Sequence, residues 1–303
     1  MVDLSIALVN WNNRDYLEQC LESIAAAHLA LDYEIVVSDN GSIDGSLAML
    51  ARRYPEVTVV ENGQNVGVAR GNNQCIRHST GRYIYILNND TLVNRDSIMR
   101  MVTFLDAHPE AGAAGGNLLN PDGSFQASFW RFPTLLEEFL IVTHIGRALN
   151  PHFPSHNGPG PDVRPVDWIS SASIVVRRTA IEGIGLIDER YFIYSDETDW
   201  QYRLWQAGWK VYYLPDVTTV HHGGGSFKRG GRRYTLVYRG RMLFARKHYT
   251  RLHSLIQRSM FAAAAVGRQM VWLALCPTCR WGNVARRQLI SNRETLHYCL
   301  RLE

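Results

Sequence analysis

Short apolar segments alternate with amphipathic segments along the first 120 residues of this chain. Apolar, β-prone runs predict strands near residues 4–10, 33–39, 57–61, 82–88 and 111–118. The intervening patterns predict helices from Arg14 to Ala27 and from Ser42 to Arg53. Strands and helices in this alternation predict an α/β fold with a doubly wound, mostly parallel sheet flanked by helices and joined by right-handed crossovers.

Three of the predicted strands end abruptly in polar residues. The first ends at Asn10, the second at Asp39, and the run from Tyr83 ends in Asn88, Asn89 and Asp90. Asn and Asp commonly form turns after strands, so a single such ending would indicate only a turn. The carboxyl ends of parallel strands share one edge of a sheet, where ligands bind. Three polar strand ends at that edge favour a ligand-binding site. A carboxylate there suits a hard divalent cation that bridges diphosphate oxygens.

Composition limits the alternatives. With 303 residues, of which 46% are hydrophobic, the chain can bury a large core as one domain with an appendage. The net charge of +4 comes without any nucleic-acid-binding motif, so no nucleic-acid partner is expected. The five cysteines are scattered, which is typical of a reducing compartment, and the single Cys276-Pro-Thr-Cys279 motif has no second pair to complete a zinc site. Because the first strand begins by residue 4, no signal peptide is expected, and the predicted location is cytoplasmic.

Five sequence blocks occur in a characteristic order. They are VNWNN, SDNGSIDGS, NVGVARGNN, LNNDT and a long block from Trp168 to Ser226, which contains IDERYFIYSDETDWQYRLWQAGWKVYYLPDVTTVHHGGGS. Each block alone is weak, but their order and spacing are specific. Over roughly residues 3 to 250 the chain resembles the family 2 glycosyltransferases with the GT-A fold, most closely their bacterial rhamnosyltransferase-like branch.

The resemblance implies an inverting, metal-dependent glycosyltransferase. Its expected donor is dTDP-L-rhamnose, and its expected acceptor is a glycan or polyprenyl-linked glycan in bacterial surface polysaccharide synthesis. Another donor, such as a UDP-hexose, and a catalytically silent sugar-nucleotide-binding subunit are the alternatives. A metal-dependent nucleotidyltransferase would need a basic, glycine-rich loop at the end of the first strand. That function is disfavoured because residues 10–13 contain no glycine.

The resemblance also places donor-binding residues. Asp39 is expected to read the pyrimidine base, because a carboxylate accepts the ring imide hydrogen. In the block near residue 65, small residues let the backbone approach a ligand, although Gly67 and Gly71 could equally serve tight helix–sheet packing. The further donor-binding candidates are Asn10, Asn65, Gly67, Arg70, Asn88 and Asn89.

Asp90 is the expected ligand of Mg²⁺ or Mn²⁺. The usual form of its motif has two carboxylates flanking one residue, whereas here the first of them is Asn88. His221 matches the family's histidine that completes the metal or diphosphate site, and His222 is the fallback.

Inversion requires a base for the acceptor hydroxyl. The resemblance assigns that role to Glu197, preceded by Asp196, at the start of a helix predicted to reach Ala207. The order of the two acids is reversed relative to the family, so the choice between them stays open. Asp199 and Arg203 form an i,i+4 pair that is either structural or diphosphate-orienting.

The expected acceptor or sugar pocket also draws on a loop near residue 170. Its candidates are Trp168, Ser171 and Ala172, together with Asp199. Relatives generally carry glycine where this chain has Ser171, so a β-carbon narrows the space there. This change bears on the identity of the sugar and not on the reaction class.

The chain is expected to organise as a catalytic domain over 1–226, with a nucleotide-binding half at 1–120 and an acceptor half at 166–226, followed by a basic helical extension over 227–303. The proline-rich stretch 121–165, with a helix predicted at Leu135–Leu149 whose apolar face carries Phe139, Leu140 and Val142, is either a lid or a packed connection. Arg258 and Arg268 argue against a membrane span at Leu255–Leu275. An amphipathic helix in the lipid headgroup layer, with Phe261 and Trp272 among its apolar residues, is the first interpretation, and packing on the domain or in a homodimer is the other.

Overall fold

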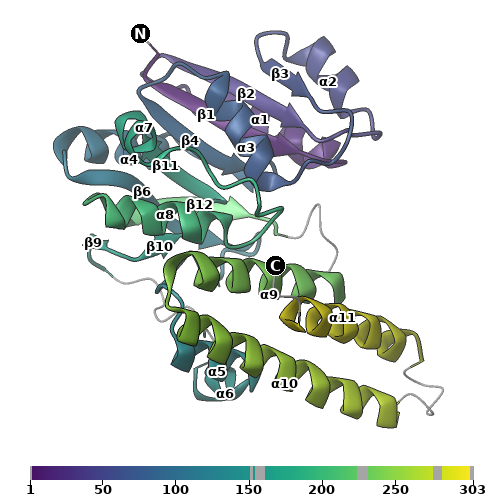
Figure 1. Cartoon of the computed structure of the whole chain (residues 1–303). Helices are drawn as coiled ribbons and strands as arrows, with labels where there is room; N and C mark the ends of the chain where they lie inside the picture. Colours follow the sequence, from purple (N-terminus) through teal and green to yellow (C-terminus); the bar gives the residue numbers. More distant parts are fainter. Residues whose placement is uncertain (1, 151–152, 154–160, 224–230, 276–281, 301–303) are drawn as a thin grey trace. The chain divides into compact units, whose positions relative to one another are not determined.

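The computed structural model describes residues 2–150, 153, 161–223, 231–275 and 282–300. The chain divides into two units (Figure 1). Unit 1 comprises Met1–Phe132, Ser155–Phe192 and Asp196–Ser226, and unit 2 comprises Pro133–Pro154, Ile193–Ser195 and Phe227–Glu303. This division differs from a single boundary after residue 226, because Pro133–Pro154 group with the C-terminal helices. The Cys276–Cys279 motif and the glycines at 224 and 225 lie outside the described residues.

The first half of unit 1 is a parallel sheet that matches the predicted alternation. The strands are β1 (Leu4–Asn10), β2 (Tyr33–Asp39), β3 (Thr58–Glu61) and β4 (Tyr83–Asn88), in the spatial order β3-β2-β1-β4. The helices between them are α1 (Arg14–Ala26), α2 (Ser46–Arg53) and α3 (Val68–Arg77). Helix α2 begins four residues later than predicted, since the backbone N–H of Ser42 donates to Asp39 (2.8 Å) in a turn that precedes the helix.

The second half of unit 1 extends the same sheet with mixed directions. Strand β11 (Ser173–Arg177) runs antiparallel between β4 and β6 (Ala111–Leu119), and β12 (Lys210–His221) runs parallel to β6 and antiparallel to β5 (Thr91–Leu92). The short strands are β7 (Phe125–Gln126) beside β6, β9 (Arg164–Pro165) beside β12, and the separate pair β8 (Phe129–Trp130) and β10 (Trp168–Ile169). The remaining helices of unit 1 are α4 (Arg95–Ala107), α7 (Arg178–Ile184) and α8 (Asp196–Gln206).

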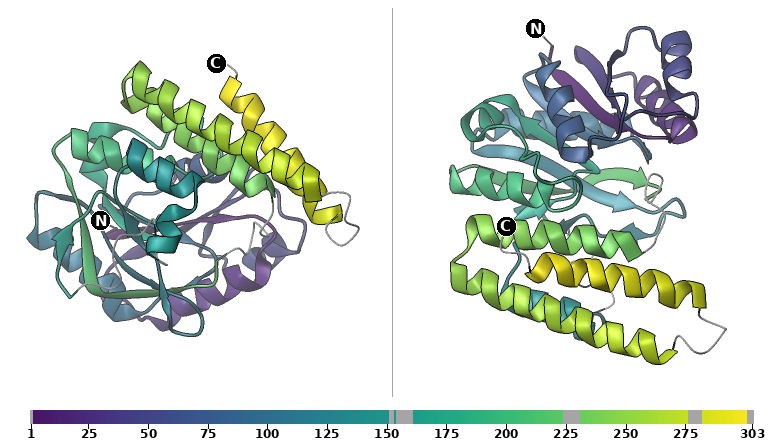
Figure 2. Two further views of the ribbon diagram at one scale, coloured as in Figure 1. Left: turned by 90° about the horizontal axis from the view of Figure 1, so that it is seen from below. Right: turned by 45° about the vertical axis from the view of Figure 1, so that its right-hand side comes forward.

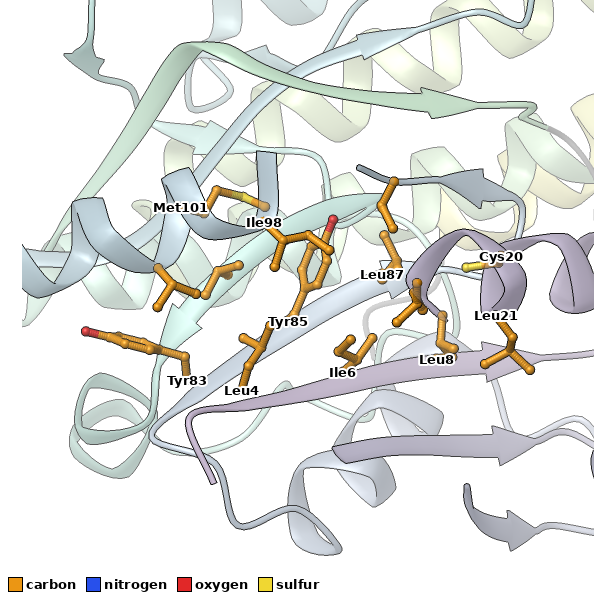
Figure 3. Close-up of a cluster of buried hydrophobic side chains, with 14 of the residues drawn as sticks. Leu4, Ile6, Leu8, Cys20, Leu21, Tyr83, Tyr85, Leu87, Ile98 and Met101 are labelled. Carbon is orange, nitrogen blue, oxygen red and sulfur yellow. The ribbon is translucent and has the colours of Figure 1, made fainter. Parts of the chain in front are cut away.

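The main core lies between the sheet and helices α1 and α4 (Figure 3). Alternate residues of β1 and β4 point into it, including Leu8 and Tyr85, which are fully buried. The hydroxyl of Tyr85 lies 2.9 Å from the Ser173 hydroxyl, so this large polar side chain is satisfied inside the core. Burial raises the pKa of the Cys20 thiol to about 12, and Cys20 therefore packs as a neutral apolar residue. This packing fixes the strand ends that carry the candidate site.

Unit 2 is helical. It contains α5 (Leu135–Val142), α6 (Ile145–Leu149), α9 (Gly231–His248), α10 (Arg251–Leu275) and α11 (Gly282–Leu300). The single helix predicted over 135–149 is wrong, because His144 adopts a positive φ of 60° and separates α5 from α6. Its predicted apolar face is divided, with Val142 buried and Phe139 exposed.

Helices α9, α10 and α11 pack against one another, and α5 packs on α10 (Figure 2). A fully buried carboxylate ties three of these helices together. Glu138 of α5 accepts hydrogen bonds from Arg241 of α9 (2.7 Å) and from Gln257 of α10 (3.1 Å). Within the described residues, no helix has the length and apolar character needed to cross a membrane.

Candidate active site

The polar ends of β1, β2 and β4 meet as predicted. Asn10 lies opposite Asp39 in the parallel register of β1 and β2. The Asn10 amide donates to Asp39 Oδ2 (2.9 Å), and its carbonyl oxygen accepts from the amide of Asn89 (2.7 Å). Asn10 and Asp39 are both fully buried, so these bonds satisfy groups that water does not reach. Three strand ends are thereby joined in one hydrogen-bonded cluster.

The turn after β2 orients the Asp39 carboxylate. Its second oxygen, Oδ1, accepts from the backbone N–H of Ser42 (2.8 Å), while Asn10 also donates to the Ser42 hydroxyl (3.1 Å). Asn12, with a positive φ of 49°, accepts from the backbone N–H of Ile43 (2.8 Å). Each carboxylate oxygen of Asp39 keeps a further lone pair for a ligand donor. The roles of Ser42 and Asn12 were not predicted, although both residues lie in the blocks VNWNN and SDNGSIDGS.

Asp90, Asn88 and His221 form a second cluster at the end of β4. His221 Nε2 lies 3.3 Å from Asp90 Oδ1 and 3.2 Å from the side-chain amide of Asn88. The strands bring His221 to this position, since His221 of β12 pairs with Thr91 of β5, the residue that follows Asp90. The backbone N–H of His222 also donates to the Asp90 carbonyl (2.9 Å). The structure therefore brings together two residues that are 131 positions apart in the sequence.

The contacts of Gln126 favour one tautomer of the neutral His221 ring. Its amide nitrogen donates to Asn120 Oδ1 (2.9 Å) and to the His221 carbonyl (3.1 Å), which leaves Oε1 to face His221 Nδ1 at 2.5 Å. An oxygen can only accept there, so Nδ1 carries the proton in the neutral ring and Nε2 presents a lone pair towards Asp90. That is the tautomer a metal-ligating histidine requires. No sequence signal identified Gln126.

The loop of Ser171 and Ala172 lies against the end of β4. The Ala172 carbonyl accepts from the backbone N–H of Asn88 (3.1 Å), and Ala172 is buried while Ser171 is half-buried. Trp168 stacks on Trp130 with ring centroids 4.4 Å apart, and its indole N–H donates to the Arg131 carbonyl (2.9 Å). The loop thus borders the second cluster, whereas the contacts of Trp168 are with the β8–β10 pair and the Arg131 carbonyl.

Helix α3 begins against the loop that leads to the acidic residues. At Gly67 (φ 89°, ψ 171°), an added Cβ would lie 2.5 Å from the Phe192 carbonyl oxygen. That carbonyl accepts from the backbone N–H of Val68 (2.7 Å), and Asn73 reaches the same loop at the Ile187 carbonyl (2.8 Å). Asn65 closes the preceding turn by accepting from the Gly67 N–H (3.0 Å). Gly67 therefore serves a close approach to the 187–192 loop.

The other predicted residues of this block have structural contacts. At Gly71, an added Cβ would meet both methyl groups of Val9 at 2.9 Å, which confirms the helix–sheet packing considered for that glycine. Arg70 is half exposed and lies 3.9 Å from Glu189. Glu189 also accepts from Asn73 (3.0 Å) and Arg77 (3.0 Å).

Asp196 and Glu197 open helix α8 after an unusual backbone segment. Tyr194 and Ser195 have positive φ values of 69° and 64°, which non-glycine residues adopt infrequently and which are enriched at functional sites. Asp196 is buried and Glu197 is half-buried. Burial and the neighbouring charge of Asp196 raise the pKa of Glu197 well above its usual range, and burial also raises the pKa of Asp196. Titrating acids of this kind are typical of general acid–base sites.

Asp199 has the geometry of a structural ion pair. Its fully buried carboxylate accepts from Arg203 Nε (3.0 Å) and from the Tyr191 hydroxyl (3.3 Å). The Arg203 guanidinium in turn donates to the carbonyls of Ile184 (2.6 Å) and Leu186 (2.8 Å). Of the two roles considered for this pair, the contacts favour the structural one.

Comparison with known proteins identifies the family. The family model described as Glycosyl transferase family 2 matches residues 5–153. The N-acetylglucosaminyl-diphospho-decaprenol L-rhamnosyltransferase of Mycobacterium tuberculosis (strain CDC 1551 / Oshkosh) is 29% identical over 245 residues, which cover 75% of this chain and 78% of that protein. This chain belongs to glycosyltransferase family 2.

Two further similarities extend this result. Rhamnosyltransferase WbbL of Escherichia coli (strain K12) is 24% identical over 225 residues, covering 72% of this family 2 glycosyltransferase and 82% of WbbL. A mannosyltransferase from Pyrobaculum calidifontis, solved with GDP-Man and Mn²⁺, superposes with a TM-score of 0.57 at 17% identity, covering 99% and 90% of the two chains. These similarities confirm the rhamnosyltransferase-like branch and the GT-A fold that the motifs implied.

Proposed function

We propose that this family 2 glycosyltransferase transfers L-rhamnose from dTDP-L-rhamnose, with inversion and with a divalent cation, to a polyprenyl-diphosphate-linked glycan in surface polysaccharide synthesis. The observation that carries the proposal is the meeting of two clusters at the ends of β1, β2 and β4. One holds the buried Asp39 carboxylate, and the other pairs Asp90 with His221. The two curated relatives, both named rhamnosyltransferases, support L-rhamnose as the sugar.

Asp39 would read the base. Its carboxylate accepts from Asn10 and Ser42 and still offers lone pairs to the imide hydrogen of thymine or uracil. Burial strengthens such a bond, because there is little competing water. Asn10 therefore acts as a positioning residue for Asp39, and the same geometry would accept a uracil base, which keeps a UDP-hexose as the alternative donor.

The residues at the end of β4 fit a divalent cation. Asp90 supplies a carboxylate oxygen, and His221 presents Nε2 on the same side. Within the described residues, no three His, Cys, Asp or Glu side chains gather to enclose a cation, so diphosphate oxygens and water would complete its coordination. When bound, the cation would neutralise charge that develops on the departing diphosphate. Gln126 holds the imidazole in the tautomer that this role needs.

Glu197 would act as the base. The acceptor oxygen forms a bond to the anomeric carbon of the donor as the bond from that carbon to the diphosphate oxygen breaks. The nucleoside diphosphate leaves with the electron pair, and the acceptor proton moves to the Glu197 carboxylate. Its raised pKa makes that carboxylate a stronger base than an exposed glutamate. Asp196 is almost completely buried, which favours Glu197 as the group that meets the acceptor.

A lipid-linked acceptor would place the enzyme at the inner face of the cytoplasmic membrane. The acceptor named in the Mycobacterium tuberculosis relative is a diphospho-decaprenol, which supports this location. A polyprenyl chain stays in the bilayer, so the enzyme must reach the surface to meet the glycan.

The donor proposal is tested by ligand-dependent thermal unfolding. With Mg²⁺ present, dTDP-L-rhamnose at a hundredfold excess over its Kd should raise the Tm by about 5 °C or more, because binding at that level stabilises by about 2.7 kcal/mol. UDP-glucose and GDP-mannose serve as competing donors, and Asp39→Ala should remove the shift. A larger Tm shift with UDP-glucose than with dTDP-L-rhamnose would identify a UDP-hexose as the donor instead.

Turnover is tested separately. NMR of the product formed on a polyprenyl-diphosphate-GlcNAc analogue should show the anomeric configuration inverted. Donor binding without any product, across donors and acceptors, would identify a catalytically silent subunit.

A further inference from the structure

The outward face of α10 is an almost uncharged apolar stripe. Its exposed positions recur every three or four residues, as on one side of a helix. The members are Leu252, Leu255, Ile256, Ser259, Ala263, Val266, Gly267, Met270, Val271, Leu273 and Ala274, which we call the α10 stripe. Leu255 and Met270 are 59% and 66% exposed, so their apolar surface faces away from the core of unit 2. Contiguous apolar surface of this extent is typical of an interaction site.

The helices next to α10 add to this surface. Helices α5 and α10 pack together, and α5 and α6 lie beside α10 in both views (Figure 2). Leu136 and Phe139 of α5 and Leu149 of α6 are also exposed. Unit 2 therefore exposes apolar side chains from three neighbouring helices.

Charge is distributed very unevenly along the chain. Residues 227–303 contain 16 of the 32 lysines and arginines but only two of the 28 acidic residues, a formal charge of +14. Residues 1–226 carry the remaining 16 basic and 26 acidic residues, a formal charge of −10. Several of the basic side chains, including Arg251, Arg286 and Arg287, are exposed on α10 and α11. The α10 stripe thus belongs to a strongly cationic segment.

We infer that the α10 stripe docks in the headgroup layer of an anionic lipid bilayer. The apolar side chains would enter the boundary between headgroups and acyl chains, while the exposed arginines of the same cationic segment attract anionic headgroups. This inference deepens the proposed function, because it names the surface that would bring the enzyme to a lipid-linked acceptor, but it rests on contacts and charges that are independent of the donor.

Three residues of α10 named from the sequence lie on its packed side instead. Phe261 is fully buried, with its ring 4.7 Å from that of Tyr238. Arg258 donates to the Cys299 carbonyl (3.0 Å from Nε), and Arg268 donates to Asn292 (3.1 Å). These three residues hold α10 to α9 and α11, so the membrane-facing side of α10 is the opposite one.

A bilayer fits this surface better than a second copy of the chain does. A symmetric dimer through the α10 stripe would bring two segments of +14 together, and like charges oppose that contact. Nucleic acid would match the charge but would leave the apolar stripe uncovered. An anionic membrane satisfies both features at once.

The test is co-sedimentation of the full-length protein with vesicles, without donor or acceptor. Vesicles of phosphatidylcholine with phosphatidylglycerol should bind the protein, and binding should weaken between 0.1 and 1 M salt, because the Debye length falls from about 10 to about 3 Å. The double variant Leu255→Gln/Met270→Gln should lower the partition coefficient roughly tenfold or more. Glutamine preserves helix propensity, so α10 should remain folded.

Two further variants separate the contributions. The control Ile43→Gln/Val163→Gln removes two exposed apolar side chains from unit 1 and should bind like the wild type. Arg286→Gln/Arg287→Gln should lower binding to anionic vesicles on the order of tenfold at low salt. If the Leu255/Met270 double variant loses its fold by circular dichroism, the single variant Leu273→Gln replaces it and should lower binding severalfold.

Three outcomes would overturn the inference: wild-type binding by the stripe variants, equal binding of the wild type to neutral and anionic vesicles, or a dimer that the stripe variant converts to a monomer without any vesicle binding. None of these outcomes concerns the donor. A failed donor assay would likewise leave the vesicle result standing, so the two proposals fail separately.

Discussion

Gly67→Ala tests whether helix α3 positions the loop before the acidic pair. The added Cβ would lie 2.5 Å from the Phe192 carbonyl oxygen and 2.8 Å from Phe192 Cδ2. Carbon and oxygen normally approach to about 3.3 Å, so Phe192 or α3 must move by about 0.8 Å. Phe192 precedes Asp196 by four residues, and the displacement is therefore expected to reach the start of α8.

The energetic cost has two parts. The backbone at Gly67 (φ 89°, ψ 171°) is in a region almost restricted to glycine, which costs a side-chain-bearing residue about 1–3 kcal/mol. Overpacking against Phe192 adds about 1–3 kcal/mol. The free energy of unfolding should fall by roughly 2–5 kcal/mol, and kcat at saturating donor should fall about tenfold to a hundredfold, because a displaced catalytic group loses its alignment.

Gly63→Ala is the matched control. Gly63 also has a positive φ, 65°, but nothing lies within 4 Å of its added Cβ. Urea unfolding should show a loss of about 1–2 kcal/mol for this variant, with kcat unchanged. A Gly67→Ala enzyme with the kcat of Gly63→Ala would refute the positioning role. A rise in the donor KM with unchanged kcat would instead indicate direct contact of Gly67 with the donor.

Four other predictions concern the proposed chemistry. Asp90→Ala should abolish most turnover and Mn²⁺ binding, measured by product assay and calorimetry; full wild-type turnover in EDTA would exclude the cation. Gln126→Leu should weaken Mn²⁺ binding about 10- to 100-fold by releasing the His221 ring, with binding of dTDP in EDTA unchanged; a change below about twofold would contradict this role. Glu197→Gln should keep donor affinity and lower kcat about a hundredfold or more, and a larger loss in Asp196→Asn would move the base one residue earlier. Because the pKa of Glu197 is raised and its base form is needed, wild-type kcat should fall as pH drops through that pKa, and Asp196→Asn should shift this limb to lower pH by removing a charge that raises it.

The hydrophobic pattern predicted the elements that are buried on both sides. Strand β1 has the predicted bounds because its apolar run is buried almost throughout, and β2 has the predicted bounds although its first three residues are not fully buried. The predicted helix bounds are wrong where a local backbone contact or conformation limits the helix within a stretch of helical apolar spacing. Ser42 uses its backbone N–H to hold Asp39, so α2 starts later, and His144 breaks a stretch whose apolar spacing continues through it.

The strand-end residues of the site could be predicted, but their supporting contacts could not. Asn10 and Asp39 lie at the ends of recognisable strands, and parallel pairing makes them neighbours. Gln126 meets His221 across 95 positions, and Gly67 meets Phe192 through two loops. No short sequence pattern indicates that the residues of either pair are in contact. Similarly, α10 has apolar residues on more than one face, and periodicity alone cannot tell which face packs inside.

The amide at position 88 is compatible with the proposed metal site. The Asn88 amide and Asp90 Oδ1 lie 3.2 and 3.3 Å from the same nitrogen of His221. A second carboxylate at 88 would lie beside Asp90 at this nitrogen and would need a bound cation to offset the repulsion. The neutral amide removes that requirement and can still offer its carbonyl oxygen to a cation, since the two ends of an amide exchange by rotation. The departure from the usual pair of acids therefore lowers the charge of the proposed site while keeping oxygen and nitrogen donors, and it does not by itself favour a silent subunit.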